Sequence, residues 1–386
     1  MVKHASVAVV GGGVVGASVA YHLAKRGVLD VVILDRGNAP GNGSTSRATG
    51  GFRAQFATRV NVGLSLLARE KLRAFHDETG VDPGYAPAGY LWIANTDRVM
   101  NALRDALAVQ RAAGLSEAEE IKAEDVSRLN PAVPQPGVIG GTWCHTDGFI
   151  RPMDILRGYI GAAERLGVTV QWGVDVCEVV LGKNHRAHEI VTSAGTVSVD
   201  CVVNAAGPWA GALRCGTSAV PVYPLKRQVA LSVATDILPE SMPMTIFVET
   251  GFHMRVRDGR VMFIAPSPPG EDPLDLSVGD DYLKSVRSEA AARVPCLENL
   301  EIDRAQCYAG FYEMSPDDHA ILGPAPWCEN LFLANGSSGH GVMHSPALGQ
   351  LLSEIICDGV ASSLDVSALR PTRFSERVLN QPVELL

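Results

Sequence analysis

Three glycines near the start of the chain have the spacing of a dinucleotide-binding turn. Gly11, Gly13 and Gly16 form a GxGxxG motif. In such a motif the first glycine permits a tight turn, the second lets the backbone approach a pyrophosphate, and the third lets a helix pack closely on a strand. Asp35 lies 19 residues past Gly16, and its carboxylate suits a ribose diol but would repel a 2′-phosphate. The pattern predicts dinucleotide binding; the alternative is a glycine-rich turn in a ligand-free α/β domain.

The elements around this motif must hold it in place. Apolar runs at 6–10 and 30–34 flank a segment at 17–26 whose apolar residues have helical spacing. This order predicts a βαβ unit with a buried parallel sheet. The N-terminus of the helix would offer N–H groups and a partial positive charge to phosphates.

The segment after Asp35 distinguishes between the two common dinucleotide cofactors, FAD and NAD. Residues 41–51 read GNGSTSRATGG, and Phe52 and Arg53 follow. A stretch of small polar residues and glycine directly after the acid looks like a loop that crosses the pyrophosphate and isoalloxazine of FAD. We therefore expect FAD rather than NAD.

Seven motifs, in order along the chain, resemble one family. They are VVGGGVVGASVAYHLAKRG, VVILDRG, GSTSRATGG, VVNAAGPWA, PVYPLKRQ, EMSPDDHAILG and NLFLANGSSGHGVMHSPALGQLLSE. Through them the chain resembles the D-amino-acid oxidase (DAO) superfamily of FAD-dependent oxidoreductases, with the sarcosine oxidase β-subunit, proline dehydrogenase and dimethylglycine dehydrogenase as the nearest branch. The resemblance implies an α/β fold: a Rossmann-like FAD-binding domain of the glutathione-reductase type, with an inserted α+β, largely antiparallel-sheet substrate domain.

The division into domains follows from the change of pattern along the chain. A length of 386 residues at roughly 150 residues per domain predicts two or three domains. The stretches 81–145 and 221–310 have a more antiparallel character than the rest. We expect a discontinuous FAD-binding domain of 1–80, 146–220 and 311–386, and a substrate domain of 81–145 and 221–310.

The motifs and the resemblance together predict the cofactor-binding residues. Val176 matches the position where the family presents backbone groups to adenine, and Trp209 either covers the cofactor or is a core residue at a strand end. The glycine turn at 336–343 precedes a helix whose N-terminus would stabilise the anionic reduced flavin. The predicted cofactor residues are Gly11, Gly13, Val14, Val15, Gly16, Asp35, Arg36, Ser44, Thr45, Ser46, Arg47, Gly50, Gly51, Val176, Ala206, Gly207, Trp209, Gly310, Ser338, Gly339, His340, Gly341, Val342 and Met343.

Three departures from the family bear on how the flavin is used. Gly310 stands where some members attach flavin through a cysteine, and Cys307 is three residues out of register, so we expect non-covalent FAD. Met262 and Met343 stand where monomeric oxidases carry lysines that activate oxygen or bind a carboxylate. These differences favour a dehydrogenase that passes electrons to a partner, with oxygen as the other possible acceptor.

Three residues are candidates for the catalytic site. Arg53 could clamp a substrate carboxylate with two parallel bonds, or it could face solvent or a phosphate. His340 would neighbour the flavin or substrate, or be a structural turn histidine, and His253 would line the pocket or be a solvated strand residue. His340 and His344 have metal-compatible i, i+4 spacing, but no third ligand is indicated, so no metal is predicted.

The resemblance implies oxidation of a carbon–nitrogen bond. We expect hydride transfer to flavin N5 from a small amino acid, secondary or N-methyl, giving an imine. A primary D-amino acid or glycine oxidase is the first alternative. The second alternative is a non-catalytic flavin-binding subunit of a larger complex. A hetero-oligomer is a possible assembly of this protein.

Composition excludes several other classes. A net charge of −9 makes the chain a poor general binder of nucleic acid or anionic lipid. No apolar run is long enough to span a membrane, and the N-terminus lacks a signal-peptide pattern. The eight cysteines include no CxxC pair, which indicates reduced thiols. We expect a cytoplasmic protein.

Overall fold

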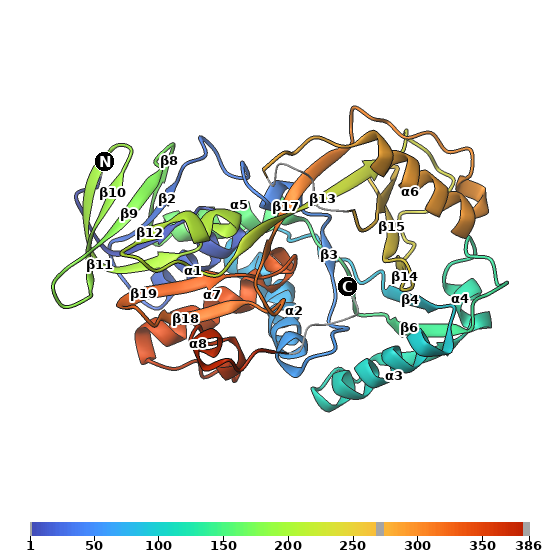
Figure 1. Cartoon of the computed structure of the whole chain (residues 1–386), viewed down its shortest axis with the longest axis horizontal. Coiled ribbons are helices and arrows are strands. Elements are labelled where there is room, and N and C mark those ends of the chain that lie inside the picture. The colour runs from blue at the N-terminus through green and yellow to red at the C-terminus, as the bar shows by residue number, and fades with distance from the viewer. Residues whose placement is uncertain (1, 268–273, 381–386) are drawn as a thin grey trace.

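Two β-sheets lie beside each other in the computed structural model, which describes residues 2–267 and 274–380 (Figure 1). The first sheet has nine strands, and its central strands are parallel. In spatial order its main path is β12 (Arg214–Cys215), β9 (Val176–Leu181), β10 (Ala187–Thr192), β11 (Gly195–Asn204), β1 (His4–Val10), β2 (Val31–Asp35) and β8 (Thr169–Trp172). The remaining strands, β18 (Ile321–Ala325) and β19 (Cys328–Asn335), join through β11.

Four helices pack together on one face of this sheet. They are α1 (Val14–Lys25), α2 (Arg59–Thr79), α5 (Pro152–Arg165) and α7 (Gly341–Asp358). Helices α1 and α7 approach closely, because a Cβ on Gly349 would lie 2.1 Å from the Ser18 hydroxyl. Because β1 and β19 both run parallel to β11, the helices that follow them, α1 and α7, begin at the same end of the sheet.

The second sheet has eight strands and is mostly antiparallel. Its spatial order is β17 (Tyr308–Met314), β13 (Tyr223–Leu231), β16 (Arg260–Ile264), β15 (Phe252–Arg257), β14 (Met244–Phe247), β4 (Tyr90–Ala94), β6 (Gly140–Cys144) and β5 (Ala118–Lys122). Around it are α3 (Asp97–Ala112), α4 (Ala123–Leu129) and α6 (Asp280–Arg293). A two-stranded ribbon of β3 (Gly51–Phe52) and β7 (Gly148–Phe149) completes the strands.

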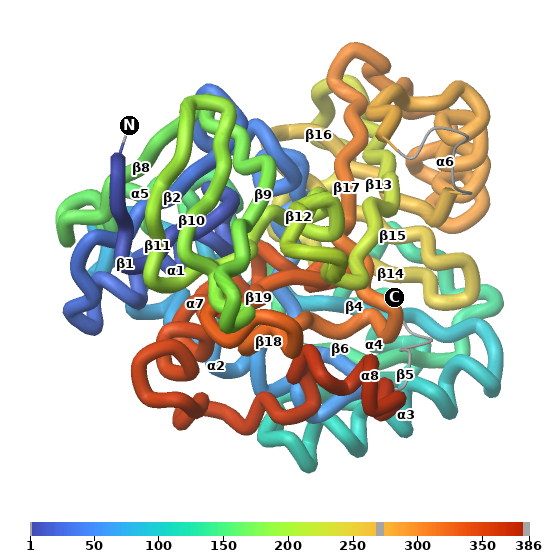
Figure 2. Tube along the Cα trace, turned by 60° about the vertical axis from the view of Figure 1, so that its left-hand side comes forward, coloured from blue at the N-terminus to red at the C-terminus, as the bar shows by residue number. Residues whose placement is uncertain are grey.

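The end of the described chain is fastened to the turn between β17 and β18. Short helical segments at Ser367–Leu369 and α8 (Arg373–Glu376) lie beside β18 (Figure 2). Arg373 is fully buried, and its Nε and Nη2 donate to the two carboxylate oxygens of Asp317 at 2.8 and 2.9 Å. Burial raises the pKa of Asp317, but the bonds from Arg373 outweigh it and lower that pKa to about 2.

The predicted fold class is confirmed: a mixed α/β architecture with a parallel and an antiparallel sheet. The predicted βαβ unit forms, with its helix at Val14–Lys25. Helices α4 and α6 lie in stretches where no helix was predicted. The domain division stays a prediction; β17 crosses its boundary between 310 and 311. Among the described residues no helix is long and apolar enough to cross a bilayer.

Candidate cofactor and substrate site

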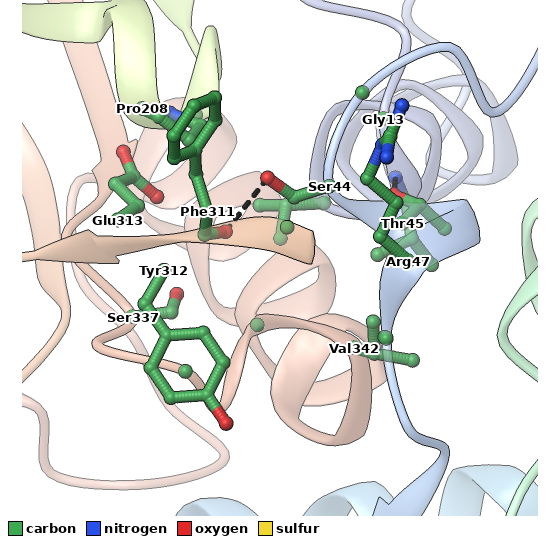
Figure 3. A pocket seen from close by; sticks show the side chains of 18 of the residues that line it. Gly13, Ser44, Thr45, Arg47, Pro208, Phe311, Tyr312, Glu313, Ser337 and Val342 are labelled. Carbon is green, nitrogen blue, oxygen red and sulfur yellow. Dashed lines mark hydrogen bonds between the residues drawn. The ribbon is translucent and has the colours of Figure 1, made fainter. Parts of the chain in front are cut away.

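A cavity of about 720 Å³ lies between the two sheets and takes residues from both. Its volume is typical of small-molecule sites, which enclose roughly 300–1,000 Å³. One end is formed by the glycine turn after β1, and the other by the face of the second sheet. Figure 3 shows its middle part, where β17, the 44–47 turn and the start of α7 meet.

The glycine turn presents backbone rather than side chains to this cavity. Gly11 has a φ of +106°, and a Cβ there would lie 2.3 Å from the Ala205 carbonyl oxygen. Helix α1 begins at Val14, and its N-cap, Gly13, has no side chain to cap it. Gly16 is not on the cavity wall; a Cβ there would lie 2.0 Å from the Gly11 oxygen, so it serves the close packing of helix and strand.

Asp35 is held at the end of β2 by backbone donors. Its Oδ2 accepts from the Gly12 N–H at 2.6 Å and its Oδ1 from the Gly37 N–H at 2.7 Å. Next to it the Arg36 guanidinium stacks 3.9 Å from the ring centre of Trp209. All three side chains line the cavity. This end therefore offers a fixed carboxylate and a flat cationic–aromatic surface.

The 44–47 turn ties the first sheet's side of the cavity to β17. Ser44 Oγ donates to the Phe311 carbonyl at 2.8 Å (Figure 3). Thr45 Oγ1 accepts from the Val14 N–H at 3.2 Å, and Arg47 Nη1 donates to the Ala309 carbonyl at 2.8 Å. Ser46 is off the wall, because its hydroxyl faces the Gly43 carbonyl at 3.4 Å instead.

The N-terminus of α7 points into the same cavity. His340 is the N-cap residue, and its side chain makes no capping hydrogen bond to the first turn. Gly339, with φ +90°, packs against the ring of Tyr312, where a Cβ would lie 2.4 Å from a ring carbon. An uncapped helix start favours a negative charge close to its free N–H groups.

Arg53 is a buried cation with several neighbours. Its Nη1 donates to the Gln55 carbonyl at 2.7 Å and its Nη2 lies 3.1 Å from His340 Nε2. The guanidinium carbon lies 4.0 Å from the ring centre of Phe56 and 5.0 Å from that of Trp92. Burial lowers the pKa of Arg53 to about 10, so it stays charged at neutral pH.

The contact with Arg53 defines the protonation of His340. A guanidinium can only donate, so Nε2 of His340 accepts and the proton of the neutral ring is on Nδ1. Burial, followed by the charge of Arg53, holds the pKa of His340 well below its usual range. His253, also on the wall, has its pKa lowered to about 4 by burial. Both imidazoles are neutral at pH 7.

Sequence reasoning missed Asp147, which holds the segment directly after Arg53. Asp147 is fully buried; its Oδ1 accepts from the Ala54 N–H at 2.8 Å and its Oδ2 from the side-chain amide of Gln55 at 3.2 Å. Burial raises the pKa of Asp147 to about 6. The only sequence signal is the Asp-Gly pair of residues 147 and 148, where β7 begins; such pairs are common in turns.

Glu313 is a second missed residue on the cavity wall. It lies on the opposite side of β17 from Tyr312 (Figure 3), and its Oε1 accepts from Asn335 Nδ2 at 3.1 Å. Burial raises the pKa of Glu313 to about 7, against the opposing effect of the backbone N–H of Gly336. Strand alternation could not have identified it, because consecutive residues of β17 from 310 to 314 all line the cavity.

The second sheet closes the other end of the cavity with a mainly apolar face. The lining residues from its strands include Tyr90, Trp92, Arg227, Val229, Met244, Ile246, His253, Ile264 and Tyr312. Met262 is fully buried in a separate apolar cluster with Val229 and Leu231 and is not on the wall. Cys307 is also off the wall; its sulfur faces the Leu231 N–H at 3.4 Å.

The structure therefore brings the predicted residues together. Every predicted cofactor residue lines the cavity except Gly16 and Ser46, and so do Arg53, His253 and His340. Their individual roles stay predictions. The wall suits a long dinucleotide. Side chains are excluded at Gly11 and Gly339, a fixed carboxylate stands at one end, and the N-termini of α1 and α7 face the space between.

Comparison with known proteins agrees with this geometry. Residues 6–355 match the family described as FAD dependent oxidoreductase, DAO. The chain is 28% identical to FAD-dependent oxidoreductase domain-containing protein 1 of Xenopus laevis, over 96% of this chain and 83% of the relative. It is 27% identical to glycine oxidase of Geobacillus kaustophilus, over 98% and 99%. The crystal structure of L-proline dehydrogenase from P. horikoshii superposes with a TM-score of 0.91 and 26% identity, over 98% and 100%.

Proposed function

Because the chain belongs to the DAO family of FAD-dependent oxidoreductases, as predicted, we propose that it oxidises the carbon–nitrogen bond of a small secondary or N-methyl amino acid. FAD, the predicted cofactor, is confirmed by the family. The observation that carries the proposal is one continuous cavity. It joins the glycine turn that suits a dinucleotide to the apolar face of the second sheet, and the buried Arg53 also lines it. The similarity to a proline dehydrogenase and a glycine oxidase supports an amino-acid substrate.

The reaction removes a hydride from the α-carbon and a proton from the nitrogen. Bound FAD supplies the two-electron acceptor. The substrate becomes an imine, which water converts to a carbonyl compound and an amine unless the imine is cyclic. The protein must hold the substrate as the neutral amine, because an ammonium has no lone pair to assist the departure of hydride.

The charges on the wall favour that neutral amine. Arg53 is a cation, and its Nη2 lies 3.1 Å from Nε2 of His340, which is neutral. A nearby positive charge destabilises an ammonium and lowers the pKa of the amine. The same charge stabilises a carboxylate. The apolar residues opposite, such as Ile246 and Ile264, exclude water from the reacting carbon.

We propose that the FAD is held without a covalent bond and that its electrons pass to a partner. Gly310 offers no nucleophile, and a Cβ there would lie 2.9 Å from Cβ of Arg47. Cys307 is directed at the Leu231 N–H and the Asp303 carbonyl rather than the cavity. The methionine at position 343 lines the cavity where a lysine would have supplied a charge.

Anaerobic mixing of the holoenzyme with a panel of amines tests the function. We expect sarcosine, N-methyl amino acids or proline to bleach the absorbance of the oxidised flavin. Bleaching by glycine or D-alanine but not by these would favour the primary amino acid oxidase. If no amine bleaches the flavin, the enzyme proposal is wrong and a non-catalytic subunit is favoured. A dye that accepts electrons faster than oxygen would identify a dehydrogenase.

A further inference from the structure

Strand β13 directs one positive charge into the cavity and the adjacent one away from it. Arg227 and Val229 line the cavity. Lys226 points to the other side, where its Nζ pairs with Asp275 Oδ2 at 2.8 Å. Gln228 also faces outward, since its Oε1 accepts from the Gly279 N–H at 2.8 Å. This alternation is that of any β-strand, and it places the Arg227 side chain on the cavity side of β13.

The guanidinium of Arg227 lies against an aromatic ring. It lies over the ring of Tyr312, with 5.5 Å between its carbon and the ring centre. In the part of the chain that the structure describes, it makes no hydrogen bond or ion pair. The carboxylate of Asp318 feels the charge of Arg227: burial raises the pKa of Asp318, and Arg227 is among the groups that lower it. Asp318 lines the cavity but forms no ion pair with Arg227.

Arg53 differs in being already engaged. Its two terminal nitrogens face the Gln55 carbonyl and His340, and the rings of Phe56 and Trp92 lie near the guanidinium. These contacts already occupy two of the five N–H donors of Arg53, one on each terminal nitrogen. The described residues occupy none of the donors of Arg227, so its paired N–H groups remain available to a carboxylate.

We propose that Arg227, rather than Arg53, is the main partner of the substrate's carboxylate. This rests on the proposed oxidation of an amine at the same cavity. The substrate class is then a carboxylate-bearing amine whose acid group is directed at the second sheet, with Tyr312 beneath the guanidinium. His253 is neutral and near both arginines, which both act on its pKa, so it adds a hydrogen-bonding group and no charge. Arg53 keeps its role beside His340.

Titration of the holoenzyme with a carboxylate that cannot be oxidised, pyrrole-2-carboxylate, tests this directly. Binding is followed by the change it causes in the visible absorbance of the flavin. We expect Arg227→Met to raise the Kd about 10- to 100-fold, because a hydrogen-bonded charge is lost. Lys226→Met is the matched control: it removes the same charge one residue away on the outer face, and we expect its Kd to stay within about twofold of that of the wild type.

A second variant and a kinetic comparison distinguish the loss of a carboxylate contact from misfolding of the protein. Arg227→Lys keeps the charge but not the paired donors, and we expect a loss of about fivefold or more. With proline and pyrrolidine as amines, Arg227→Met should raise KM for proline and leave KM for pyrrolidine unchanged. FAD content per chain checks each variant.

The outcomes separate this proposal from the proposed function. If no amine reduces the flavin but Arg227→Met weakens carboxylate binding, the function is wrong and the assignment of Arg227 stands. Unchanged binding in Arg227→Met, an equal loss in Lys226→Met, or no response of the wild type to the carboxylate would each overturn the assignment.

Discussion

Replacing Glu313 by glutamine should remove a pH dependence of stability that originates in the cavity wall. Burial raises the pKa of Glu313 to about 7 from a usual value of 4.5. The folded state therefore binds a proton that the unfolded state releases between these two values. The stability from this group is fully present below pH 4.5 and is lost as the pH rises through 7. Linkage gives a loss of about 2.5 kcal/mol between pH 5 and pH 8.

The assay compares urea unfolding of the FAD-free wild type and Glu313→Gln at a series of pH values. Other groups, including Asp147 with its pKa of about 6, titrate in both proteins and cancel in the difference. We expect the wild type to lose about 2.5 kcal/mol relative to the variant between pH 5 and pH 8. Parallel curves for the two proteins would show that Glu313 is ionised in the folded state and would refute the reasoning.

Three further changes have defined outcomes. Gly11→Ala should abolish FAD binding, judged by flavin absorbance, because its Cβ would lie 2.3 Å from the Ala205 oxygen at a φ of +106°; normal flavin content would contradict this. Arg373→Met should lower the free energy of unfolding by about 3–5 kcal/mol, because it leaves the Asp317 carboxylate buried and unpaired; urea denaturation measures it. Acid precipitation should release all FAD from both the wild type and Cys307→Ser, and any flavin left on the wild-type polypeptide would show a covalent bond.

The sequence was informative where the backbone itself is restricted. A glycine turn between a strand and a helix has few possible conformations, so Gly11, Gly13 and Asp35 could be placed from their spacing alone. The loop at 41–51 and the glycine turn at 336–343, before α7, were predicted for the same reason. In each case the signal is local and needs no knowledge of distant strands.

The residues that were missed depend on pairing between distant segments. Arg227 is opposite Gly310 across β13 and β17, and its place on the cavity wall depends on strands that the local sequence does not reveal. Asp147 accepts a hydrogen bond from the N–H of Ala54, which lies 93 positions earlier in the chain. Helix α6 was missed because it buries only a narrow stripe of Tyr282, Val286 and Ala290.

The fastening of Arg373 to Asp317 has a consequence for the order of biosynthesis. The turn that Arg373 braces also carries Asp318, a residue of the cavity wall. Vectorial translation makes the glycine cradle among the first segments and this brace more than three hundred residues later. Because every residue that lines the cavity precedes residue 344, the contact between Arg373 and Asp317 can form only after all of them have been synthesised.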